Sequence, residues 1–95
     1  MFNYQARWDR VLPSNKLYKG EPIEVLIKFS YGKIVPLAFS LQQKRMKIDR
    51  IYYSWKKRQG LRELFYFNVS CAGEFFCLLW DTMDQRWYVK ILNSP

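Results

Sequence analysis

The residues of this chain best suited to chemistry are basic and aromatic, and they gather in one stretch. Residues 44–62 hold eight Lys and Arg side chains and a single acid, Asp49, so this stretch supplies +7 of the net charge of +8. A field of one sign beside aromatic rings suits a phosphate backbone and its bases. The predicted nucleic-acid contacts are Lys44, Arg45, Lys47, Arg50, Lys56, Lys57, Arg58, Arg62 and, as a stacking ring, Tyr52.

The same charges have a simpler interpretation, a solvated strand and loop that keep the protein soluble. Clustering with aromatic residues favours the binding interpretation, and Tyr66 and Tyr88 are further candidate stacking rings. We therefore expect a nucleic-acid-binding domain with little sequence preference and a bias toward single strands.

Catalysis is disfavoured by the residue types that the chain lacks. It has no histidine, which removes the commonest general base, any Ser–His or Cys–His pair and the usual zinc ligand. Asp81 and Asp84 share one turn that would bind a divalent cation weakly, but an Asp there more often accepts a backbone hydrogen bond. We expect a protein that is not an enzyme and needs no metal or cofactor.

Length and composition indicate one folded domain. The 95 residues are 49% hydrophobic and 19% aromatic, enough for a core. We expect residues 20–92 to form it, with residues 1–19 as an arm or added strand. No apolar run reaches the roughly 18 residues of a membrane span, and the N-terminus lacks a secretion signal, which predicts a cytoplasmic protein.

Alternation of apolar and polar residues predicts strands nearly throughout. Residues 23–29 and 35–41 alternate on either side of a turn at 31–33, and Pro36 marks an edge because it cannot donate to a ladder. We predict an all-β fold: a small antiparallel barrel or strongly curled sheet of about six strands.

The basic stretch has two apolar sets of opposite parity. Met46 and Ile48 share one face, whereas Ile51, Tyr53 and Trp55 share the other. A β-bulge near residues 49–50 would turn both sets toward the core. This places Trp55 in the core, followed by a loop over residues 56–60.

The last third of the chain reads as a meander of strands over 63–70, 74–80 and 86–92, with a tight turn at residues 72–73. In that register the two cysteines, Cys71 and Cys77, lie about 10 Å apart, beyond the reach of a disulfide, and stay reduced. One face forms a core wall of Phe65, Phe67, Val69, Phe76, Leu78, Trp80, Trp87, Val89 and Ile91.

The opposite face of the meander is also apolar, which requires a cover. Two covers fit: the N-terminal arm, in which Phe2, Tyr4, Ala6 and Trp8 alternate, or a second subunit. This face supports an alternative function, a protein-interaction or dimerisation module without nucleic-acid contact. Its predicted interface residues are Tyr66, Phe75, Leu79, Tyr88 and Leu92.

Turn and strand residues follow one another in a recognisable order along residues 20–92. The order is Gly20-Glu21-Pro22-Ile23-Glu24-Val25, Pro36-Leu37-Ala38-Phe39, Ile48, Ile51, Trp55, Tyr66-Phe67-Asn68-Val69, Gly73, Phe76, Leu78, Asp81 and Trp87-Tyr88-Val89. This order resembles a small uncharacterised bacterial domain, which occurs alone and at the C-terminus of inactive, Y-family-polymerase-like proteins of mutagenic repair. The resemblance implies a DNA-repair setting and a repair-protein partner, and it carries no catalytic residues.

Overall fold

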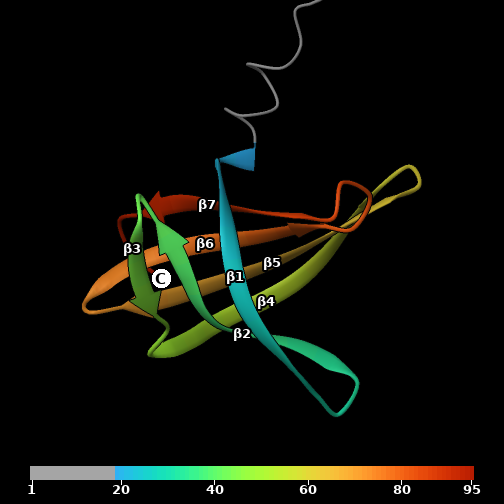
Figure 1. The fold of residues 1–95 in the computed structure, drawn as a ribbon. Helices are drawn as coiled ribbons and strands as arrows, with labels where there is room; N and C mark the ends of the chain where they lie inside the picture. The colour runs from blue at the N-terminus through green and yellow to red at the C-terminus, as the bar shows by residue number, and fades with distance from the viewer. Residues whose placement is uncertain (1–18) are drawn as a thin grey trace, which may run out of the picture.

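The computed structural model describes residues 19–95, which form seven antiparallel strands in one sheet of order β3-β2-β1-β7-β6-β5-β4 (Figure 1). The predicted all-β class is therefore confirmed, with one strand more than expected. The predicted arm residues Phe2, Tyr4, Ala6 and Trp8 lie outside the described part. The strands are β1 (Glu21–Ser30), β2 (Lys33–Leu41), β3 (Lys44–Lys47), β4 (Arg50–Gln59), β5 (Arg62–Cys71), β6 (Glu74–Asp81) and β7 (Arg86–Leu92).

The sheet curls into a half-barrel because β1, and the segment formed by β3 and β4, each pair with one strand at one end and with another strand at the other end. β1 pairs with β2 along most of its length but with β7 only over residues 21–23, and it then crosses the other strands (Figure 1). Between β3 and β4, the N–H of Ile48 donates to Leu37 O at 3.0 Å, and the N–H of Asp49 donates to Ser70 O at 2.8 Å. β3 and β4 therefore act as one bent strand that joins β2 to β5.

The core fills the concave side of this half-barrel. The Phe39 and Phe76 rings meet edge to face at 5.2 Å between centroids, and the Trp80 and Trp87 rings lie 5.3 Å apart. The Phe39–Phe76 contact joins the two halves of the sheet and stabilises the curl, whereas the two tryptophans pack across the β6–β7 pair. The buried cluster consists of Phe39, Met46, Phe67, Val69, Cys71, Phe76, Leu78, Trp87 and Val89.

The predicted meander register is confirmed. Phe67 lies opposite Leu78, and Trp80 lies opposite Trp87. One member of the predicted core wall is wrong: Ile91 is 75% exposed. Among the described residues, no strand lies beside this end of β7, because β1 begins at Glu21, opposite Val89.

The tight hairpin turns are built on left-handed residues. Tyr31-Gly32, Gln42-Gln43 and Ala72-Gly73 all have positive φ at both positions. That is the type I′ geometry whose twist matches the flanking strands. At Gln42-Gln43 neither residue is glycine, so the short β3 follows β2 at a conformational cost.

The prediction for the basic stretch is wrong in two respects. Residues 56–59 are not a loop but the end of β4, which continues to a tight turn at residues 60–61. The register irregularity lies between Ile51 and Tyr53 rather than at residues 49–50. Ile51 therefore keeps its place against the core, whereas Tyr53 and Trp55 turn to the outside.

A second irregularity, between Leu26 and Ile27, changes the expected alternation in the first hairpin. Leu37 and Phe29 hold apolar positions of the alternating pattern, yet Leu37 turns outward and Phe29, near the hairpin end, is 74% exposed. Pro36 lies opposite Ile27 of β1. On its other side β3 pairs only with residues 38–41, so the missing N–H of Pro36 leaves the β2–β3 hydrogen bonds intact.

Candidate nucleic-acid interface

The outer face of β4–β7, turned away from the core, carries an aromatic platform. Trp55 lies opposite Tyr66 across the β4–β5 pair, and their rings stack at 4.9 Å between centroids and 1° between planes. Trp55 remains 44% exposed. This geometry leaves ring surface open to a ligand, whereas the sequence had placed Trp55 in the core.

A groove of about 360 Å³, hereafter the outer groove, adjoins this platform. Leucine side chains and Cys77 give it an apolar lining, while Lys57 and Lys90 add positive charge. Its lining residues are Lys19, Trp55, Lys57, Tyr66, Asn68, Cys77, Leu79, Lys90 and Leu92.

Asn68 gives the outer groove a polar element. Its Nδ2 donates to Pro95 O at 3.2 Å, and its Oδ1 is buried and accepts no hydrogen bond within the described part of the chain. A buried carbonyl oxygen that accepts no hydrogen bond costs free energy. A ligand that donates a hydrogen bond to Asn68 Oδ1 would therefore bind more tightly.

The β4 bulge adds an aromatic–cation pair to the outer face. Arg50 lies over the Tyr52 ring at 4.7 Å from its centroid, and that ring meets Phe75 edge to face at 5.8 Å. Tyr52 and Arg50 thus lie on the same outer face as the Trp55–Tyr66 platform.

Two further predicted contacts point to the other face of β4. Lys56 lies opposite Phe65 of the core wall, and Arg58 lies opposite Glu63. Glu63 accepts a hydrogen bond from Arg58 at 2.9 Å and lies 3.8 Å from Lys56. The hydrogen bond from Arg58 and the charge of Lys56 lower the pKa of Glu63. Glu63 therefore offsets part of the charge of both.

Arg62 belongs to a different cluster, around Asp81. Asp81 is fully buried and forms ion pairs with Arg62 and, at 2.7 Å, with Lys19. Burial by itself raises the pKa of Asp81, but the hydrogen bond from Lys19 and its other partners outweigh this, and the net pKa is lowered. The ion pair with Asp81 thus accounts for the position of Arg62 without a ligand.

Asp81 also begins the β6–β7 turn, as the sequence indicated. Its Oδ1 accepts from the N–H of Met83 at 3.0 Å and of Asp84 at 3.2 Å. The two carboxylates that were considered for a cation are thus occupied by Lys19 and Arg62. Within residues 19–95, no group of three or more His, Cys, Asp or Glu residues is placed to hold a metal.

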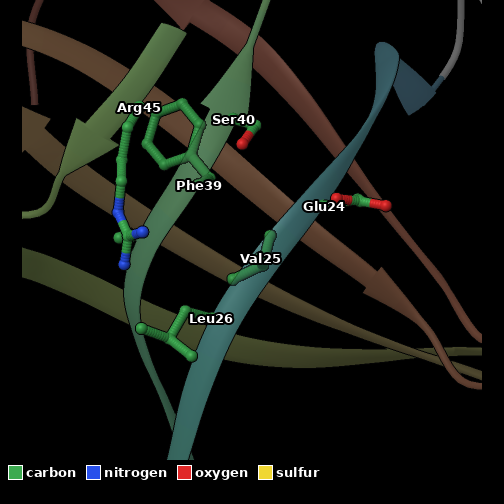
Figure 2. A pocket seen from close by; sticks show the side chains of 7 residues that line it. Glu24, Val25, Leu26, Phe39, Ser40 and Arg45 are labelled. Carbon is green, nitrogen blue, oxygen red and sulfur yellow. The ribbon is translucent and has the colours of Figure 1, made fainter. Parts of the chain in front are cut away.

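The three basic residues of β3 lie on the other half of the barrel. Arg45 borders a hollow of about 250 Å³ on β1–β3, and the Glu24 carboxylate, which also borders it, points away from Arg45 (Figure 2). Lys44 and Lys47 are exposed at either end of β3. The structure therefore divides the predicted basic stretch at the bend between β3 and β4.

The structure thus gathers Arg50, Tyr52 and Lys57 on the outer face and separates the other predicted contacts from them. Sequence reasoning missed Trp55, Lys90 and Asn68. A hairpin turn at Gly60-Leu61 was the available signal for Trp55, because it would have set Trp55 opposite Tyr66.

The predicted interface residues also lie on the outer face. Leu79 is only 3% exposed, and Tyr66, Phe75, Tyr88 and Leu92 are half-buried. The predicted state of the cysteines is confirmed, since both are free. Burial, with a smaller contribution from nearby acids, raises the pKa of Cys71 to about 11, so it stays a thiol at neutral pH.

Comparison with known proteins gives no relative: no family model, curated protein or solved structure matches the chain. Across residues 19–95, no helix has the length and apolar character needed to cross a membrane.

Proposed function

We propose that this domain binds single-stranded nucleic acid with little sequence preference, through the outer face of β4–β7. The observation that carries the proposal is the half-exposed Trp55 ring, stacked on Tyr66 at 4.9 Å and bordered by lysines. Bases of any kind stack on such rings, because every base has a π-face.

Charge on the same face supports the proposal. Lys57 and Lys90 line the outer groove, and Arg50 lies over Tyr52 nearby. Cations beside stacking rings fit the alternation of base and phosphate along an unpaired strand. The setting would be DNA repair, as the sequence resemblance implies, with no catalytic role for the domain.

A titration with a labelled single strand at two salt concentrations tests the proposal. If Arg50, Lys57 and Lys90 each contact one phosphate, affinity should fall by about 20-fold between about 50 and about 200 mM salt. Lys57→Gln should weaken binding and flatten that dependence, whereas Lys28→Gln, an exposed lysine on β1, should change neither.

An alternative outcome would favour the interaction-module function. Burial of the outer face against a protein depends on apolar area and responds little to salt. If the chain does not bind single strands at about 50 mM salt, the nucleic-acid proposal is wrong.

A further inference from the structure

The edge strand β4 is unusually open for the end of a sheet. It is ten residues long, contains no proline and pairs only with β5 among the described strands. Its counterpart at the other end, β3, has four residues. Proteins commonly keep edge strands short or interrupt them, because unpaired N–H and C=O groups accept any further strand.

The exposed part of this edge runs from Tyr53 to Arg58. On the side away from β5, the backbone groups of these residues have no strand partner within residues 19–95. The bulge that interrupts β4 lies before Tyr53, so the remaining pairing with β5 is regular and the free edge is continuous.

The side chains along this edge are basic at one end and aromatic at the other. Lys56, Lys57 and Arg58 follow one another, and β4 contains no acid. Tyr53 and Trp55 precede them, both more than a third exposed. Within the described part of the chain, Glu63 on β5 offsets part of this charge.

We propose that the free edge of β4 binds an extended acidic segment of a partner protein as an added antiparallel strand. Acidic residues of the segment would lie opposite residues 56–58, and a β-branched residue would lie against Trp55. Main-chain hydrogen bonds supply affinity in this mode, and alternate side chains supply selectivity. A second copy of β4 has no acid to place against residues 56–58, so it fits this edge less well than an acidic segment.

This inference goes beyond the proposed function and does not depend on it. Nucleic acid would use the outer groove, whereas the peptide would use the main-chain edge and also Lys56 and Arg58 on the opposite face of β4. The two sites share Trp55 and Lys57, so tight binding at one would lower affinity at the other.

A synthetic peptide of sequence Glu-Glu-Glu-Val-Thr-Val, capped at both ends, tests the inference on the full chain. Two matched peptides carry N-methyl groups on alternate residues, each set blocking the donors of one peptide edge. An added strand uses one edge, so one set should lower affinity at least tenfold and the other should leave it within about twofold. Equal affinity of all three peptides would show attraction by charge alone and overturn the inference.

Charge reversal supplies the protein-side control. The double variant Lys56→Glu, Arg58→Glu should lower affinity for the unmodified peptide at least tenfold, with an unchanged far-ultraviolet spectrum. The matched variant Lys28→Glu, Lys33→Glu on β1 and β2 should leave affinity unchanged. Protection of β4 amides from hydrogen exchange by the peptide completes the evidence, and protection confined to other strands contradicts it.

Discussion

At the scale of single residues, the effect of replacing Trp55 distinguishes a role in binding from a role in folding. The sequence placed it in the core, where truncation to alanine would cost about 3–5 kcal/mol. In the structure it is 44% exposed and stacks on Tyr66. Loss of one aromatic pair costs about 0.5–1.5 kcal/mol beyond the buried area, so the domain should survive its removal.

We predict that Trp55→Ala folds normally and loses about 1–3 kcal/mol of single-strand binding, or roughly five- to 150-fold in affinity. Thermal unfolding and a fluorescence titration measure the two effects. Tyr31→Ala is the matched control, since Tyr31 is fully exposed at the tip of the first hairpin. If Trp55→Ala unfolds the domain, the stacked, exposed placement of this ring is wrong.

Asp81 is the opposite case, a charged residue whose role is structural. Its carboxylate is buried between Lys19 and Arg62, and removing one partner of a buried ion pair costs about 3–5 kcal/mol. Asp81→Asn should therefore lower the free energy of unfolding by about 3 kcal/mol at neutral pH, measured by urea denaturation. Asp84→Asn, at a side chain 36% exposed, should cost less than about 1 kcal/mol.

The same cluster sets a pH window for stability. The pKa of Asp81 is lowered on folding, so its contribution is present above its unfolded pKa of about 3.9 and is lost as pH falls through the folded value. The pKa of Lys19 is raised, because its hydrogen bonds outweigh burial, and its contribution is lost as pH rises through the folded value. Stability should thus decline in acid and in strong alkali, and Asp81→Asn should flatten the acid decline.

At the scale of elements, the Gln42-Gln43 turn is a conformational cost that can be removed. Both residues have positive φ, 52° and 65°, which costs about 1–2 kcal/mol per residue for side chains with no local compensation. The double change Gln42→Asn, Gln43→Gly should raise the free energy of unfolding by about 1 kcal/mol.

Gly73 provides the reverse test of turn geometry. It has a φ of 84°, and a Cβ placed on it would meet nothing within 4 Å. Gly73→Ala should therefore cost about 1 kcal/mol from backbone conformation alone. A rise in the free energy of unfolding at Gln42-Gln43 and a fall at Gly73 would support the type I′ assignment. A lower free energy of unfolding with glycine at residue 43 would contradict it.

The strands that the sequence predicted correctly are those in which pattern and turn agree. Ala72-Gly73 set the register of β5 and β6, and every pair from Leu64 to Cys71 then followed. The errors arose where a single-residue irregularity reversed parity, at Leu26–Ile27 and at Ile51–Tyr53. A bulge depends on contacts between distant strands, which alternation along one segment does not report.

The candidate site was harder to predict for the same reason. Arg50, Tyr52 and Lys57 were identified by residue type, but Trp55 joined them only because the bulge turned it outward. Arg62 was separated from them by Lys19 and two aspartates, the nearer of which is 19 residues further along the chain. Net charge along the sequence does not distinguish a paired arginine from a free one.

At the scale of the whole molecule, the curl of the sheet decides which charges act together. β3 and β4 are consecutive in sequence, yet they pair with β2 and β5 on different halves of the barrel. The basic stretch is therefore divided, and Arg50 and Lys57 lie with the exposed Trp55 ring on the outer face of β4–β7. The central claim is that this face binds single strands.

Amide and indole N–H chemical shifts, recorded during titration with a short single strand, test that claim most directly. We predict that the perturbed resonances gather at residues 50–57 of β4 and at Tyr66 and Lys90, with the Trp55 indole among the largest. The hollow beside Arg45 on β1–β3 should stay unperturbed at equal strand concentration. Perturbations centred on β1–β3, or none up to millimolar strand, would contradict the account.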